Sequence, residues 1–183
     1  MTKSADAKSA VPPVQISEGR VIPAAPAYVW SVVGDFGNEH KWASQLKHCQ
    51  RDTDKVRVGS VRYCTLAKPL MGRSAVEEEL IDYDPGKTLS YRLRGGAGPF
   101  RSAEGRWTIR ADADGTFVEV GGRFQPRSAL VRTLFGRLAR AVAVRAAHRA
   151  LDDLAAFVAR PSAPDSQVDA APDLLTRPDR SPE

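Results

Sequence analysis

The segment at residues 127–160 constrains the fold most, because it is the only stretch long and alanine-rich enough to form one dominant helix. From Ala139 onward, apolar residues recur at helical spacing and charged residues fall on the opposite side. Apolar residues before Gly136 point in another direction, so we predict a short helix, a kink or break at Gly136, and a long helix over 137–159. At ~1.5 Å per residue the long helix would run ~35 Å, enough to cross a sheet.

The apolar face of this predicted helix is bulky in its last turns and thin in its middle. Its middle is built from small side chains, namely Ala143, Ala146, Ala147 and Ala150, and its end from Leu151, Leu154, Phe157 and Val158. Small side chains allow either close packing of the helix on a sheet or a cavity between the two. The residues alone leave both alternatives open.

Length and composition predict one globular domain with two tails. The 183 residues, 42% of them hydrophobic, suit a single core. We place the domain at 14–160. Residues 1–13 are small and polar, and 161–183 contain five prolines, so both are predicted to be disordered. No apolar run approaches the ~20 residues of a membrane helix, and the start does not resemble a signal peptide, so we expect a soluble protein.

Cysteine and histidine usage gives no sign of a metal centre. Cys49 and Cys64 form no CxxC motif, and with only three histidines they make neither a disulfide framework nor a zinc site. We therefore predict no metal, no cofactor and a cytoplasmic location.

The formal charge of +5 owes much to residues 127–160, which hold seven arginines against Asp152 and Asp153. These arginines are spread around the helix, and no aromatic-rich basic motif accompanies them. This pattern favours a solvated basic face, so we do not expect dedicated nucleic-acid binding.

Ahead of the long helix, the chain indicates strands and two short helices. A strand at 14–22 precedes one short helix that opens at Pro26 and ends near Gly34, and a second that closes on Trp42. Six further strands are predicted at 46–52, 58–67, 74–83, 88–94, 100–110 and 116–125. The later strands alternate between apolar and polar residues, which indicates an antiparallel sheet with one apolar face. The C-terminal helix is the element long enough to cover it.

This order of elements, together with several sequence stretches, resembles the polyketide cyclase/dehydrase and lipid-transport family of the START-like (Bet v 1-like, SRPBCC) superfamily. The stretches are AAPAYVWSVVGDFGNEHKW, VGSVRYCTLAKPLMG, AVEEELIDYDPGKTLSYRL and GRWTIRADADGTFVEVGGRFQP, followed by the terminal helix. The resemblance covers residues 15–159. It implies an α+β helix-grip fold, with a curved seven-stranded antiparallel sheet around the long C-terminal helix and a hydrophobic cavity between them. It therefore favours the cavity over close packing.

A weaker likeness is to plant abscisic-acid receptors of the same superfamily. It rests on Lys47-His48-Cys49 and on Glu78-Glu79-Leu80 followed by Asp84. The gate loop of those receptors falls at 67–72 and their latch loop at 95–101. The latch histidine and arginine are replaced here by Gly98 and Pro99, and the gate sequence also differs. Recognition of that hormone or of its phosphatase partners is therefore not expected.

Glu78 is the polar residue most in need of explanation. It is in phase with Val76 and Leu80, so it faces the interior if they do, where an unpaired carboxylate would be costly. Its candidate partners are Lys47, Arg62 and the hydroxyls of Tyr63 and Tyr91. Alternatively, the strand is shifted by one residue and Glu78 is a surface charge. His40, His48 and His148 lack the neighbours of a catalytic triad.

We predict that the protein binds a hydrophobic or amphipathic small molecule, lipid-like or polyketide-like, between sheet and helix. The predicted ligand-binding residues are Lys47, Tyr63, Glu78, Leu89, Tyr91, Leu93, Trp107, Val118, Val120, Ala143 and Ala147. The predicted loop gates are Pro69, Leu70, Met71, Pro99 and Phe100.

Two other functions stay open at this point. One is an aromatase/cyclase-like or lyase enzyme, whose catalytic set would be Glu78, Lys47, Tyr63 and Tyr91. The other is a protein that docks a partner or membrane surface through its basic helix and the loops at Leu70 and Phe100. Monomer and homodimer are both compatible with the sequence.

Overall fold

The computed structural model describes residues 11–70 and 72–160. The predicted tails, 1–13 and 161–183, lie outside it apart from residues 11–13. The elements in chain order are β1 (Val14–Ile22), α1 (Pro26–Val33), the 3-10 helix η1 (Glu39–Lys41), β2 (Leu46–Arg51), β3 (Val61–Leu70), β4 (Arg73–Asp84), β5 (Thr88–Leu93), β6 (Phe100–Asp112), β7 (Gly115–Pro126) and α2 (Ala129–Val158). No described helix is both long and apolar enough to cross a membrane.

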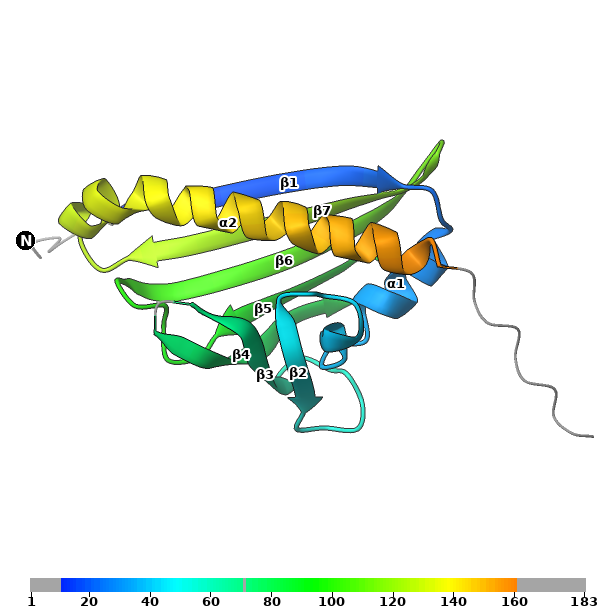
Figure 1. The fold of residues 1–183 in the computed structure, drawn as a ribbon, viewed down its shortest axis with the longest axis horizontal. Coiled ribbons are helices and arrows are strands. Elements are labelled where there is room, and N and C mark those ends of the chain that lie inside the picture. Colours follow the sequence, from blue (N-terminus) through cyan, green and yellow to red (C-terminus); the bar gives the residue numbers. More distant parts are fainter. Residues whose placement is uncertain (1–10, 71, 161–183) are drawn as a thin grey trace, which may run out of the picture.

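The seven strands form one antiparallel sheet in the order β1-β7-β6-β5-β4-β3-β2. The sheet curves around α2, which runs along β1 and β7, while α1 and η1 lie near the C-terminal end of α2 (Figure 1). This is the predicted α+β helix-grip architecture, confirmed in the number of strands, the order of elements along the chain and the placement of the long helix. The alternation of apolar and polar side chains fixes which face the sheet turns toward α2.

β3 departs most from the sequence prediction, which placed it at 58–67. β3 begins at Val61 and continues to Leu70, so most of the expected gate loop at 67–72 is strand. The β3–β4 connection is a tight hairpin in which Gly72 adopts the left-handed conformation that favours glycine. Met71, one of the predicted gates, lies outside the described residues, and the side chain of Leu70 is not described.

The predicted break at Gly136 is wrong, because α2 is one continuous helix from Ala129 to Val158. Ser128 caps its start by accepting a hydrogen bond from the backbone of Val131 at 3.2 Å. Gly136 is buried against Val14 of β1. The helix therefore continues through Gly136, where it packs on β1, without a change of direction.

The hydrophobic core is concentrated at the end of the sheet where α1 and the last turns of α2 meet. Its fully buried members include Val29, Phe36, Leu80, Val118 and Leu154. Leu151 and Val158 complete the covering face of α2. The bulky last turns of the helix, predicted from the sequence, are thus the part that seals the core.

Replacing Gly136 by Ala tests the continuity of α2. A Cβ at this position would meet Val14 at 3.5 Å, an ordinary contact, and alanine favours the helix over glycine. We expect Gly136→Ala to raise the free energy of unfolding by about 0.5–1 kcal/mol in urea titrations. A loss of stability would indicate that the helix needs a flexible point here.

Candidate functional site

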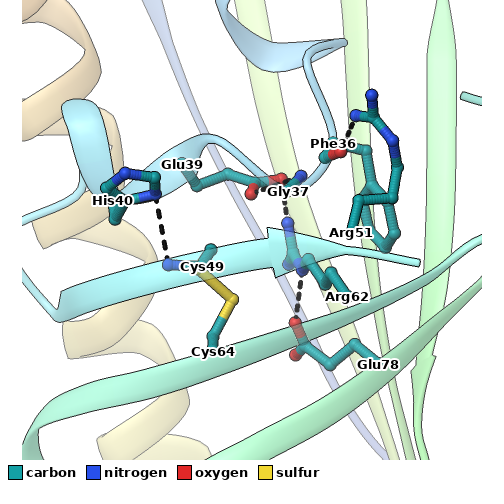
Figure 2. Close-up of a disulfide and its surroundings, with 9 residues drawn as sticks. All are labelled: Phe36, Gly37, Glu39, His40, Cys49, Arg51, Arg62, Cys64 and Glu78. Carbon is teal, nitrogen blue, oxygen red and sulfur yellow. Dashed lines mark hydrogen bonds and ion pairs between the residues drawn. A yellow bond between two sulfur atoms is a disulfide. The ribbon is translucent and has the colours of Figure 1, made fainter. Parts of the chain in front are cut away.

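Arg62 on β3 lies at the centre of a buried ionic cluster. Its guanidinium group donates from Nε to Oε2 of Glu78 on β4 at 2.7 Å, and from Nη1 to Oε1 of Glu39 in η1. Oε2 of Glu39 also accepts a hydrogen bond from the backbone of Gly37 at 2.8 Å. Figure 2 shows the guanidinium group between the two carboxylates. Only 5% of Arg62 is exposed, so one buried cation faces two acidic groups.

Two aromatic rings enclose the same guanidinium group. The centroid of Phe36 lies 4.4 Å from Arg62 Cζ, and that of Tyr91 lies 4.6 Å away. Cation–π contact of this kind stabilises a buried arginine that has lost its water. Tyr91 fits beside it because Gly105 on β6 has no side chain, and a Cβ there would lie 2.4 Å from the tyrosine ring. Strand pairing between β5 and β6 sets Tyr91 opposite Gly105.

Tyr91 keeps its proton over an unusually wide pH range. Burial raises its pKa to about 12, and the negative charge of Glu78 acts in the same direction, while Arg62 opposes them. The phenol is therefore a hydrogen-bond donor at neutral pH. A carboxylate, a guanidinium and a protonated phenol thus lie together on the inner face of β3, β4 and β5.

Trp42, at the end of the short helix η1 that carries Glu39, supplies a further buried donor. Its ring packs edge-on against Trp107 with the centroids 5.7 Å apart. Its indole Nε1 is buried and has no hydrogen-bond acceptor among the described residues. Buried donors are normally paired, so an unpaired one marks a place where a ligand oxygen could be accommodated.

Beyond the cluster, the inner face of the sheet is apolar but only partly covered. The side chains concerned are half-buried, unlike those of the core, and they are Val76, Leu93, Phe124, Ala139 and Ala143. Val76, Leu93 and Phe124 lie toward the ends of β4, β5 and β7 that are near the β3–β4 hairpin, the β5–β6 loop and the start of α2. The ionic cluster lies between this half-open surface and the closed core.

The loops around that half-open end are tied to one another. Arg73 at the start of β4 donates hydrogen bonds to the carbonyl oxygens of Gly95 and Gly96 at 3.1 and 3.0 Å. The backbone of Arg127, just before α2, donates to the carbonyl of Pro99 at 3.3 Å. These contacts connect the β3–β4 hairpin, the β5–β6 loop and the start of α2.

A disulfide joins Cys49 on β2 to Cys64 on β3, directly beside the ionic cluster (Figure 2). The two cysteines are paired residues of neighbouring strands. The expectation that these cysteines form no disulfide framework is therefore corrected. The cytoplasmic location was predicted mainly from that expectation, and disulfides are rare in the reducing cytoplasm. The side chains of Glu39, Cys49 and Cys64 lie close enough together to hold a metal ion in principle. Because the two sulfurs are bonded to each other, however, they are not available as thiolate ligands.

His40 lies on the other side of Cys49. Its Nδ1 accepts a hydrogen bond from the backbone N–H of Cys49 at 3.2 Å. Burial lowers the pKa of His40, and the neighbouring His48 and Lys41 act in the same direction. The neutral ring is thus favoured, with its proton on Nε2. His148 pairs with Glu18 at 2.8 Å across α2 and β1.

The structure brings together some of the predicted ligand-binding residues and separates others. Glu78 faces inward and meets Arg62, one of its candidate partners, while Glu77 and Glu79 face outward toward Arg94. Lys47 is exposed and makes no ion pair with Glu78. Tyr63 is 43% exposed on the outer face of the sheet. Of the predicted catalytic set, only Glu78 and Tyr91 are therefore neighbours.

The apolar part of the predicted pocket is largely packed. Five of its residues are buried members of the core, namely Leu89, Trp107, Val118, Val120 and Ala147. Tyr91 and Ala143 pack against that core and Leu93 is half-buried. Two open hollows of about 650 and 630 Å³ occur elsewhere, and neither is lined by these eight residues. The centre of the core is filled by these side chains, so a ligand between sheet and helix would lie at the half-open end.

Among the predicted gates, Phe100 is buried against Phe124 with centroids 5.9 Å apart. It is therefore a core residue of the β5–β6 region and is not available as a docking side chain. Pro69 is exposed near the end of β3, and Pro99 is half-buried.

Glu39, Phe36 and Trp42 are site residues that the sequence did not identify as such. They lie in the turn and short helix between α1 and β2, where no periodic pattern reveals which side chains point inward. The one available signal was Arg62, which is in phase with Cys64 on the inner face and therefore required acidic partners.

Comparison with known proteins assigns the chain to a family. Residues 13–159 match the family model described as polyketide cyclase / dehydrase and lipid transport. The chain belongs to this family. No curated protein sequence matches it significantly.

Solved structures of the same fold include three that are informative. Ara h 8.0201 has a TM-score of 0.63 at 15% identity, covering 80% of this chain and 97% of its own. The Zhui aromatase/cyclase from Streptomyces sp. R1128 has a TM-score of 0.64 at 16% sequence identity, and the match covers 80% of this chain and 93% of the Zhui chain. The di-domain ARO/CYC StfQ from the steffimycin biosynthetic pathway has a TM-score of 0.67 at 11% sequence identity, and the match covers 80% of this chain and 51% of the StfQ chain. At these identities the likeness establishes the fold alone.

Removing Arg62 should unfold the protein much more readily than removing an exposed arginine. Arg62→Ala leaves Glu39 and Glu78 as buried carboxylates without their cation, which costs about 3–5 kcal/mol. The matched control is Arg92→Ala, whose pair with Glu104 is half exposed and is worth at most about 1 kcal/mol. Urea unfolding of both variants measures the difference, and equal losses would contradict a buried cluster.

Tyrosinate absorbance should show one tyrosine ionising near pH 12, and Tyr91→Phe should remove that step. Because the folded state raises this pKa above its ordinary value of 10.0, the corresponding stability is present below pH 10 and is lost between pH 10 and about 12. Rapid pH-jump spectra separate this ionisation from unfolding. An unchanged high-pH step in Tyr91→Phe would show that another tyrosine is responsible.

Proposed function

We propose that the protein binds an amphipathic small molecule whose oxygen-bearing end reaches the Arg62 cluster and whose apolar body lies on the half-open inner face. The observation that carries this proposal is the junction of two surfaces. Glu78 and Tyr91 form a polar end, the unpaired N–H of Trp42 belongs to a ring that packs against Trp107, and half-buried apolar side chains continue toward the loops. Ligand sites commonly combine an apolar wall with a few polar groups that fix orientation.

The chemistry of the polar end indicates a neutral oxygen group. Tyr91 and Trp42 are donors, whereas Glu78 is a carboxylate that accepts hydrogen bonds and repels a ligand carboxylate. Arg62 already serves two carboxylates and has little charge to offer a third. A ketone or phenol therefore suits the site better than an acid. Family membership and the two aromatase/cyclases among the similar structures support an aromatic polyketide-like ligand.

A second candidate function is catalysis of a cyclisation or dehydration on such a ligand. It is favoured by one observation, which is that a protonated Tyr91 lies next to Glu78, so that a proton donor and a proton acceptor share the site. Glu78→Gln would then abolish turnover while binding persists, because only the proton transfer is lost. In a binding protein the same change alters affinity alone.

Displacement of a fluorescent hydrophobic probe, anilinonaphthalene sulfonate, tests the binding proposal. We expect saturable displacement by a hydroxynaphthyl ketone and weaker displacement by the matched alkylnaphthalene. Trp42→Phe keeps the ring and removes the donor, so it should weaken the ketone by about 0.5–1.5 kcal/mol and leave the hydrocarbon unchanged.

Tyr63→Phe is the matched control, because Tyr63 lies on the outer face and its hydroxyl should not matter for either ligand. If neither compound displaces the probe, or if both variants weaken both ligands equally, the proposed polar end is not a ligand site. Native mass spectrometry of the purified protein would identify any molecule that it retains.

A further inference from the structure

The first half of α2 presents apolar side chains to solvent. Leu130, Leu134 and Leu138 are 67%, 63% and 63% exposed, and Phe135 and Val142 are exposed as well. We call these five residues the apolar stripe. Four of them follow each other at intervals of four residues, so they form a row along one side of the helix for ~18 Å.

The stripe lies on the side of α2 that faces away from the sheet. Gly136 is the residue buried against β1, and Leu134 and Leu138 are two positions from it, which places them roughly 160–200° around the helix. This explains why apolar residues before Gly136 point in another direction from those after Ala139. The sequence pattern that suggested a break in the helix instead marks a second apolar surface on a continuous one.

Basic residues flank the stripe without acidic ones. Residues 127–149 contain six arginines and no aspartate or glutamate. Three of the arginines, Arg132, Arg137 and Arg140, line an open hollow of about 650 Å³ beside Val14 and Gln15 of β1. Arg132 and Arg140 lie on the side of Gly136, whereas Arg137, Arg145 and Arg149 lie roughly 100–180° around the helix from it, beside the stripe. Within the part of the chain that the structure describes, none of Arg137, Arg145 and Arg149 forms an ion pair.

We infer that this half of α2 docks on an anionic lipid surface. The apolar stripe would enter the boundary between headgroups and acyl chains, and the arginines beside it would contact lipid phosphates, as in interfacial amphipathic helices. Charge complementarity favours this occupant over a second copy of the chain, since two copies would place twelve arginines near one another with no acidic partner from these segments.

The inference is independent of the proposed ligand site. The stripe and the hollow share no residue with the Arg62 cluster. Figure 1 shows the first turns of α2 extending past the end of the sheet that lies away from α1 and η1. The helix could therefore rest on a surface while the inner face of the sheet remains accessible.

Cosedimentation of the full chain with vesicles tests this inference. We expect binding to phosphatidylcholine vesicles that contain phosphatidylglycerol, little binding to phosphatidylcholine alone, and a decrease with added salt. Leu134→Ser combined with Leu138→Ser should reduce partition at least tenfold, because two exposed apolar anchors are lost. Each of Arg137→Gln and Arg145→Gln should reduce it about fivefold.

The matched controls are Val58→Ser and Arg57→Gln, in the loop between β2 and β3 on the far side of the fold (Figure 1). They remove an exposed apolar group and a charge elsewhere, so vesicle binding should not change. All replaced residues are exposed, and circular dichroism checks that each variant stays folded. Equal losses in stripe and control variants would overturn the proposal.

Two other occupants of this surface give different results. If the stripe is a contact between copies, sedimentation velocity will show a concentration-dependent dimer that Leu134→Ser with Leu138→Ser dissociates, and vesicles will not bind. If the hollow takes a soluble phosphate compound, the protein will bind glycerol 3-phosphate at matched ionic strength and will not sediment with vesicles. Either outcome contradicts docking on a lipid surface.

Discussion

A single helix must cover the apolar face of a seven-stranded sheet, and this mismatch shapes the rest of the molecule. Strands lie ~4.8 Å apart, so the sheet is about three times wider than one helix. The sheet curves to reduce the difference, and α1 and η1 fill part of what remains at one end (Figure 1). At the other end no comparable element is present among the described residues, and apolar side chains there stay half-buried.

The Arg62 cluster lies where the covered part of the sheet gives way to the uncovered part. Buried charges need complete pairing, and here one residue from each of β3, β4 and η1 supplies it. The cluster thereby attaches η1 to the start of β3. It also places Tyr91 and Glu78 beside an apolar surface, so a structural ion pair and a possible ligand contact are built from the same side chains.

The sequence predicted the sheet well, because alternation and turn residues are local signals that repeat along every strand. β1 was predicted residue for residue, and Glu78 was oriented correctly by its phase with Val76 and Leu80. The helix was predicted less well. A change in the direction of apolar residues at Gly136 was interpreted as a break, because the pattern shows which side is apolar and not what that side faces.

Contacts between segments were the least predictable. Cys49 and Cys64 are 15 residues apart, and nothing marks them as partners until the register of β2 against β3 is known. Lys47 and Arg62 were both candidate partners of Glu78, but β2 presents Lys47 to solvent, and Arg62 on the directly neighbouring strand is the partner. Glu39 lies in a short helix without any periodic signal, so its contribution required the three-dimensional arrangement.

The disulfide also bears on how the sheet ends. β2 is an edge strand, and an unprotected edge can pair with another chain. Cys49 and Cys64 fix β2 to its neighbour covalently, so the edge cannot peel away to expose the backbone of β3 in the interior of the sheet. Exchange of β2 between molecules, a common route to swapped dimers, is open only to the reduced protein.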